Sequence, residues 1–178
     1  RHLDLAAAEN RALDAERSRA RQHVRSVVSA MQNAEDIEDV VVVLRDELRS
    51  LGVEVDQVGI NVADEEEGTI RASWSSLVGD DEVGVTHGGH QTPSASNARL
   101  LEIWKSGEIW NRPRSETNPT DQGWVVDVPF EFGTLAMNRG QEVAGAPAFT
   151  DDEVATLQRF ADVISLGYTR FRDFERLE

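Results

Sequence analysis

The chain contains no cysteine among its 178 residues. This absence excludes disulfides, thiolate metal sites, cysteine nucleophiles and any cofactor attached through a thioether. Basic residues are also few, with 18 Lys and Arg against 33 Asp and Glu, so the formal net charge is −15. That charge weighs against nucleic acid and anionic membranes as partners, because both require a basic surface. No apolar run approaches the ~18 residues of a membrane span, and we therefore expect a cytoplasmic protein.

The composition, 39% hydrophobic and 29% charged, is that of an ordinary globular chain. The length suits one domain with appendages. We predict an N-terminal coiled-coil helix over residues 1–33, a domain over 34–166 and the start of a second signalling helix over 167–178. Because the chain begins at Arg1 instead of Met, we expect it to be a fragment of a longer protein, joined to a further domain.

The first thirty residues show heptad spacing with no Gly or Pro. Two series of positions repeat: Leu3, Asn10, Arg17, Val24 and Met31, and Ala6, Leu13, Ala20 and Val27. Such spacing favours a coiled coil, and a polar residue such as Asn10 within the seam favours two parallel strands. We predict a homodimer seam through Leu3, Asn10, Leu13, Val24 and Val27. The alternative is an amphipathic helix packed on its own domain.

The rest of the chain predicts alternating helices and hairpins. Asn33 and Asp36 resemble a capping box before an apolar helix that ends at Gly52. Alternating residues over 53–62 and 69–74 predict a β-hairpin, and a second hairpin is expected over 124–130 and 133–138. A helix around residue 100 ends at Gly107. The segments 75–96 and 108–123 are expected to be loops.

The last helix has clear start signals, with Thr150 as N-cap and Glu153 completing a capping box. A 4–3–4–3 spacing links Phe160, Ile164, Gly167, Phe171 and Phe174, so we predict that this helix leaves the domain with a second dimer seam. That seam includes Phe171 and Phe174.

This order of elements resembles a GAF domain of a bacterial multidomain signalling protein, of the histidine kinase, nucleotide cyclase or phosphatase type. The resemblance covers roughly residues 35–176, and its best-matching piece is the stretch 125–137, where Val128-Pro129-Phe130 ends one strand and Gly133 opens the next. It implies an α+β, PAS-related fold with a central antiparallel sheet, helices on both sides and long terminal helices. It also implies a ligand pocket under a lid formed by residues 75–122.

The same resemblance limits which classes of ligand the chain is expected to bind. The bilin-carrying and free-methionine sulfoxide reductase branches both need cysteine, which the chain lacks. The cyclic-nucleotide pattern is matched only poorly, by Asn111-Arg112-Pro113-Arg114. We therefore expect no resident cofactor and no catalysis by this fragment.

Aromatic and basic residues supply the pocket candidates. The candidates are Trp74, Trp104, Trp110, Arg112, Arg114, Trp124 and Asp127. Arg112 and Arg114 can clamp a carboxylate or phosphate through their forked donors; alternatively, they neutralise Glu108 and Glu116. The tryptophans suit pocket walls, or they pack between the sheet and the lid helix. Strand alternation puts Asp127 on the face opposite Val126, either toward the lid or toward solvent.

His87 and His90 are the one closely spaced histidine pair. Two imidazoles at this spacing are able to bind metal or haem. However, Gly88 and Gly89 separate them and the sequence positions no third ligand, so we expect a solvent loop and no metal site.

These observations together predict a regulatory, dimeric domain that senses a small molecule and relays the signal through its flanking helices to an output domain. The alternative is a ligand-free dimerisation and spacer module.

Overall fold

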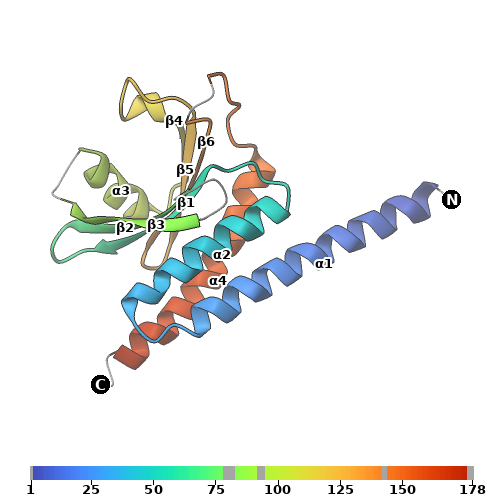
Figure 1. Cartoon of the computed structure of the whole chain (residues 1–178), viewed down its shortest axis with the longest axis horizontal. Helices are drawn as coiled ribbons and strands as arrows, with labels where there is room; N and C mark the ends of the chain where they lie inside the picture. Colours follow the sequence, from blue (N-terminus) through green and yellow to red (C-terminus); the bar gives the residue numbers. More distant parts are fainter. Residues whose placement is uncertain (1, 78–82, 92–94, 142–143, 176–178) are drawn as a thin grey trace.

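A six-stranded antiparallel sheet forms the centre of the protein (Figure 1). The computed structural model describes residues 2–77, 83–91, 95–141 and 144–175. The strands are β1 Gln57–Asp64, β2 Thr69–Leu77, β3 Val83–Gln91, β4 Trp110–Pro113, β5 Trp124–Phe130 and β6 Gly133–Arg139. Their order across the sheet is β3-β2-β1-β6-β5-β4, so two three-stranded meanders join where β1 pairs with β6.

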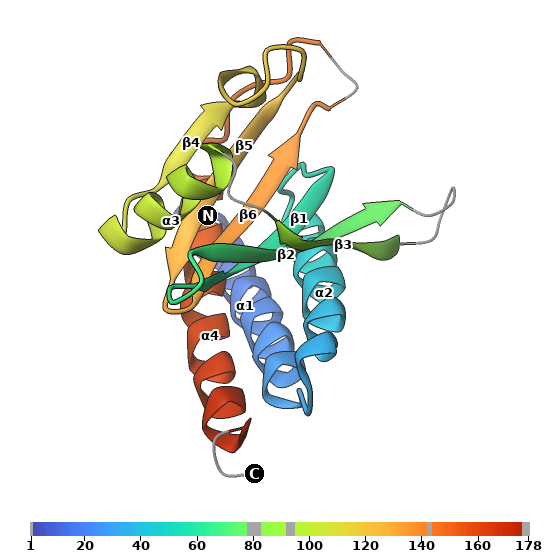
Figure 2. The same cartoon turned by 90° about the vertical axis from the view of Figure 1, so that its left-hand side faces the viewer.

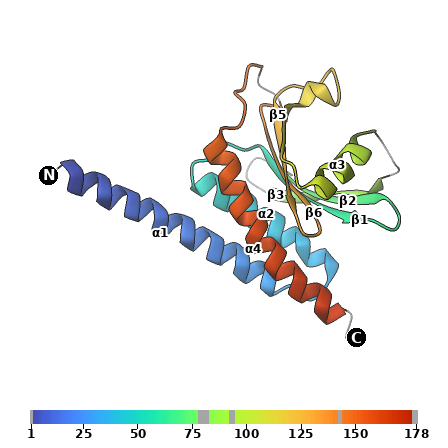
Figure 3. The same ribbon diagram turned by 180° about the vertical axis from the view of Figure 1, so that it is seen from behind.

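Helices cover both faces of the sheet. The helices are α1 His2–Ser29, α2 Ile37–Ser50, α3 Ala95–Ser106 and α4 Asp151–Glu175, with two short 3₁₀ helices, η1 Ala34–Asp36 and η2 Arg114–Glu116. Helices α2 and α4 lie on one face, and α1 packs on them as an outer layer (Figures 1 and 3). Helix α3 lies on the opposite face (Figure 2). The α+β fold with a central antiparallel sheet is therefore confirmed.

The predicted N-terminal capping boxes form at both helix starts. Asn33 Oδ1 accepts hydrogen bonds from the N–H groups of Glu35 and Asp36 at 3.1 and 3.2 Å, and Asp36 returns the contact to the Asn33 N–H. At α4, the Thr150 N–H donates to Glu153 and the Glu153 N–H donates to Thr150 Oγ1. These reciprocal bonds satisfy donors that the first turn of a helix otherwise leaves open.

The main hydrophobic core lies between the sheet and the three helices on one face. Alternation along β5 directs Val126, Val128 and Phe130 into this core and Asp127 to the opposite face, as predicted. The second half of α1 contributes Ala20, Val24, Val28 and Met31 to the same core. Residues 20–31, which we predicted to lie in a separate arm, therefore pack with the domain.

Two predicted loops contain strands. Residues 83–91, including the His87–His90 segment, form β3 and pair with β2, with a register irregularity opposite Ile70 and Ala72. Trp110–Pro113 forms β4 and pairs with β5. Both are edge strands, and their Gly, Pro and Asn content gives little intrinsic β preference, so tertiary pairing decides their conformation.

Part of the two predicted seams packs within the protomer. Val24 is fully buried, Val27 is partly buried, and Phe171 is 4% exposed against the chain's own core. The last helix was predicted to leave the domain from residue 167, but Tyr168 and Phe171 lie in the chain's own core.

The first half of α1 differs from the second. Residues 4–16, including Asn10, are exposed, with Leu5 at 61% and Leu13 at 38%. The side chains of Leu3 and Phe174, two further residues of the predicted seams, are outside the part of the chain that the structure describes. Within the described residues, every helix is too short or too polar to cross a membrane.

Candidate functional site

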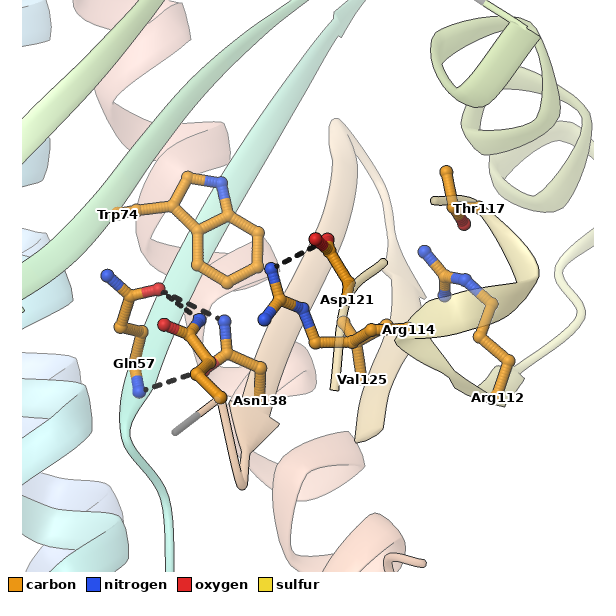
Figure 4. Close-up of a pocket in the computed structure, with 9 residues that line it drawn as sticks. Gln57, Trp74, Arg112, Arg114, Thr117, Asp121, Val125 and Asn138 are labelled. Carbon is orange, nitrogen blue, oxygen red and sulfur yellow. Dashed lines mark hydrogen bonds and ion pairs between the residues drawn. The ribbon is translucent and has the colours of Figure 1, made fainter. Parts of the chain in front are cut away.

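A polar pocket opens on the sheet face that α2 and α4 leave uncovered (Figure 4). Its volume is about 250 Å³, slightly below the range of ~300–1,000 Å³ typical of ligand pockets. The lining residues come from five strands, from η2 and from the segments that follow η2 and β6: Gln57, Trp74, Arg112, Arg114, Thr117, Asp121, Val125, Asn138 and Gln141.

Strand alternation explains why these residues share a face. In β1 and β6, Val58 and Met137 point into the helix-side core, so their neighbours Gln57 and Asn138 point to the open face. Trp74 of β2 pairs with Gly59 of β1. A Cβ on Gly59 would lie 2.5 Å from Trp74 Cδ2, so the missing side chain makes room for the indole against the sheet.

Arg112 forms a buried ion pair at one wall of the pocket. Its Nη1 donates to Asp127 Oδ2 at 2.8 Å and to the Trp110 carbonyl at 3.1 Å. The Arg112 guanidinium carbon lies 3.2 Å from the centroid of the Trp110 ring, a cation–π arrangement. Arg112 Nε is buried and makes no hydrogen bond within the described residues.

Asp127 is the most deeply buried acid of this network, at 2% exposure. Its Oδ1 accepts hydrogen bonds from Thr134 Oγ1 at 3.0 Å and from Asn61 Nδ2 at 3.3 Å. Burial raises the pKa of Asp127 above its ordinary value, and the charge of Arg112 and these hydrogen bonds oppose that rise. A buried ion pair often stabilises a fold less than apolar residues of similar volume, so its place at a pocket favours a functional role.

Arg114 has a different, more exposed partner. Its Nη2 lies 3.1 Å from Asp121 Oδ2, and its Nη1 lies 3.4 Å from the Gln122 carbonyl oxygen. Figure 4 shows the Arg114 guanidinium between Trp74 and Asp121. The alternative prediction for Arg112 and Arg114 named the wrong acids, because their ion pairs are with Asp127 and Asp121 and not with Glu108 and Glu116.

Three amide side chains line the opposite wall. Gln57 Oε1 accepts hydrogen bonds from Asn138 Nδ2 at 3.1 Å and from Gln141 Nε2 at 2.7 Å, and Asn138 Oδ1 accepts one from the Gln57 N–H at 3.2 Å. Gln57 Nε2 and Gln141 Oε1 make no hydrogen bond in the described part of the chain. The wall therefore offers a ligand one donor and one acceptor group.

The predicted site residues divide into three groups. Trp74, Arg112 and Arg114 line the pocket, and Trp110 and Asp127 hold Arg112 in place. Trp104 and Trp124 lie elsewhere, because Trp104 Nε1 donates to the Phe130 and Glu131 carbonyls at the far end of β5 and Trp124 packs against the helix-side core.

The amide wall and Asp121 were missed by the sequence interpretation. The sequence does contain a signal for the amide wall, because Asn138 is a polar residue within a predicted strand, next to the core residue Met137. No comparable signal marks Asp121, whose role depends on how the segment after η2 folds back toward Arg114.

A larger and more apolar hollow, of about 480 Å³, lies between the ends of α1 and α4. Val28, Met31, Gly167 and Phe171 line it together with Ser29, Arg170 and Asp173. We prefer the sheet-face pocket as the candidate site because charged and amide groups converge there, as they do in ligand sites.

Metal ligands do not cluster among the described side chains, where no three His, Asp or Glu residues are placed to share an ion. The side chains of His87 and His90 lie outside those described, so the structure does not test them.

Comparison with known proteins supports the fold alone. No protein-family model matches the sequence, and no curated protein matches it. A free methionine-R-sulfoxide reductase from Neisseria meningitidis, solved in complex with its substrate, aligns with a TM-score of 0.57 at 13% identity over 88% of this chain and 90% of that one.

Two further structures share the architecture. A structure described as that of the GAF domain aligns with a TM-score of 0.57 at 12% identity, covering 87% of this chain and 88% of that one. Residues 122 to 287 of a methyl-accepting chemotaxis protein align with a TM-score of 0.56 at 14% identity, covering 86% and 98%. The chain therefore has a GAF-like fold, as the sequence resemblance predicted.

Proposed function

We propose that this chain is a regulatory, non-catalytic domain that binds a small molecule in the sheet-face pocket and passes the binding event to its terminal helices. The observation that carries the proposal is the convergence of two arginines, Trp74 and three amides on one hollow of the open sheet face. The GAF-like fold, shared with a chemotaxis-protein fragment, is consistent with a signalling role.

A short route connects the pocket to α4. Asn138 lines the pocket, and the next residue, Arg139, points to the opposite face of β6. The buried Arg139 side chain donates to the Glu153 carboxylate in the first turn of α4, and its guanidinium carbon lies 3.9 Å from the centroid of the Phe149 ring. A displacement at the end of β6 would therefore reach the start of α4.

Dimerisation is the second part of the proposal. The exposed first half of α1 continues the stripe of residues that packs in the core further along the helix, and Asn10 and Leu13 lie exposed on it. Pairing this half with its copy in a second protomer would cover these side chains in a parallel seam that includes Leu3, Asn10 and Leu13. An output domain joined to the helices would then receive the signal.

One observation favours a ligand-free spacer module instead. Arg112 and Arg114 each form an ion pair with an acid of the same chain, so neither guanidinium requires a ligand for its charge.

Thermal unfolding in the presence of oxo-acids, amino acids and nucleotides separates the two functions. We expect at least one compound to stabilise the wild-type protein, by about 2.7 kcal/mol at 100 times its dissociation constant. Arg114→Ala should abolish this stabilisation. Arg159→Ala, an exposed substitution on α4, should leave it unchanged. Equal unfolding temperatures with and without every compound would favour the spacer module.

A further inference from the structure

We propose that the pocket binds a small monocarboxylate and that Asp121 occupies, in the free protein, the position that the ligand carboxylate takes on Arg114. The carboxylate of the ligand would displace Asp121 and form the ion pair with Arg114 in its stead. The inference rests on the proposed ligand-binding function, and it adds the chemical class of the ligand and an internal competitor.

The two ion pairs of the pocket differ in how readily a ligand can exchange with them. The side chains of Arg112 and Asp127 are 6% and 2% exposed, and two further hydrogen bonds hold Asp127. Those of Arg114 and Asp121 are 25% and 32% exposed. Breaking the deeper pair would leave a buried charge unpaired, which costs several kcal/mol, whereas the partly exposed pair exchanges at small cost.

The segment that carries Asp121 can release its carboxylate without unfolding. The Arg114 N–H donates to the Gly123 carbonyl at 2.9 Å, which closes the base of the segment. Asn118 Nδ2 donates to Asp121 Oδ1 at 3.0 Å, and the Asp121 N–H donates to the Asn118 carbonyl at 2.9 Å. None of these three bonds involves the Arg114 guanidinium, so the Asp121 side chain keeps a partner when it leaves Arg114.

Charge counting limits the ligand to one negative charge. Asp127 already neutralises Arg112, so the departure of Asp121 leaves one unpaired positive charge, on Arg114. Asp121 itself stays nearby, and the whole chain carries −15, which disfavours a dianion such as phosphate. The carboxylate of Asp121 also shows that a planar anion fits against this guanidinium.

The other walls of the pocket indicate which chemical groups the rest of the ligand carries. The Trp74 indole presents an apolar wall beside Arg114 (Figure 4). Gln57 Nε2 and Gln141 Oε1 offer a donor and an acceptor across the pocket. Within about 250 Å³, these groups suit a compact amino, hydroxy or oxo acid.

Isothermal titration of three variants tests the displacement. The probes are pyruvate, L-lactate, L-alanine, L-glutamine and inorganic phosphate, each at fixed salt. Asp121→Asn removes the competing charge with little change of shape, and Asp121→Ala repeats the test with a smaller side chain. We expect both to bind at least one of the four monocarboxylates about five- to tenfold more tightly than wild type does, and Arg114→Gln to lose binding.

Glu108→Gln is the matched control, because it removes one exposed negative charge near β4 that belongs to no pocket wall. It should leave the affinities unchanged. If wild type binds a probe but Asp121→Asn binds it no better than Glu108→Gln does, the displacement is wrong and the ligand-binding function stands. Preference for phosphate would overturn the ligand class. If no probe binds to any variant, the monocarboxylate proposal fails, and the thermal-unfolding panel decides separately whether the ligand-binding function stands.

Discussion

Glu47 of α2 ties the outer helix α1 to the inner layer. It is 6% exposed, and it accepts hydrogen bonds from Arg19 Nη2 at 2.9 Å and from His23 Nδ1 at 2.6 Å, both on α1. Burial alone would raise the pKa of Glu47, but the hydrogen bonds from His23, Arg19 and Ser50 and the charge of Arg19 outweigh it and lower the pKa below 4.5. The charged form therefore stabilises the contact between α1 and α2.

The sign of the pH dependence follows from that lowered pKa. Below pH 4.5 the unfolded chain binds a proton at Glu47 more readily than the folded protein does, so stability is lost as the pH falls through the folded pKa. We expect Glu47→Gln to cost about 1–3 kcal/mol at pH 7. We also expect this difference from wild type to shrink as the pH falls below 4.5, measured by urea unfolding with tryptophan fluorescence.

Glu54→Gln is the control for this prediction, since Glu54 is exposed and none of the ion pairs among the described residues includes it. Its effect should be small at every pH. A difference between wild type and Glu47→Gln that stays constant from pH 7 to pH 3.5 would contradict the role of the charged carboxylate.

The candidate site was predictable from the sequence only in part. Arg112 and Arg114 stand out as a closely spaced basic pair in an acidic chain, and alternation along β5 places Asp127 opposite the main core. The pairing of Arg112 with Asp127 depends on β4 lying beside β5 in the register that sets Trp110 opposite Asp127. That register depends on how residues 114–123, which connect the two strands, fold back, and four residues of β4 carry too little pattern to determine it.

At the scale of whole elements, α1 and α4 cross closely at Gly167. A Cβ on Gly167 would lie 2.2 Å from Val28 Cγ1. The small residue therefore lets the two helices approach, and Val28 fills the space at the crossing.

Gly167→Ala tests the closeness of this crossing. Alanine favours a helix by about 1 kcal/mol over glycine, but overpacking a tight contact typically costs about 1–3 kcal/mol. We expect a net loss of stability of up to about 2 kcal/mol in urea unfolding. Leu166→Ala, at the adjacent exposed position, should stay within about 0.5 kcal/mol of wild type. A Gly167→Ala protein more stable than wild type would show that the helices can separate at no cost.

Elements whose signals are local were predicted well. Asn33 with Asp36 and Thr150 with Glu153 form caps from residues three apart. The edge strands β3 and β4 were missed because their hydrogen bonds come from β2 and β5. Of the predicted stripe along α1, Ala20, Val24 and Met31 are buried, in the protomer's own core. The spacing itself does not say whether the partner helix belongs to the same chain.

At the scale of the molecule, α1 combines two environments in one helix. Residues 4–16 are exposed, whereas Ala20, Val24 and Val28 are buried in the core. Figures 1 and 3 show the N-terminal half of α1 extending away from the sheet and the other helices.

Two truncations distinguish the roles of these halves. Removal of residues 1–16 should leave the domain folded, because the described side chains it removes are exposed, and should convert the proposed dimer to a monomer in light scattering. Removal of residues 1–31 should abolish cooperative unfolding, because it takes four buried side chains out of the core. An untruncated 178-residue chain that is strictly monomeric at high micromolar concentration would contradict dimerisation through α1.

The tight crossing at Gly167 also gives α1 the geometry of a lever. From residue 4 to residue 28 the helix spans about 36 Å at 1.5 Å per residue. A change of about 5° in the angle between α1 and α4 would displace the tip of α1 by about 3 Å, whereas the side chains at the crossing would move by only a fraction of that distance. Small differences in packing at Val28 are thereby magnified at the N-terminal tip of α1.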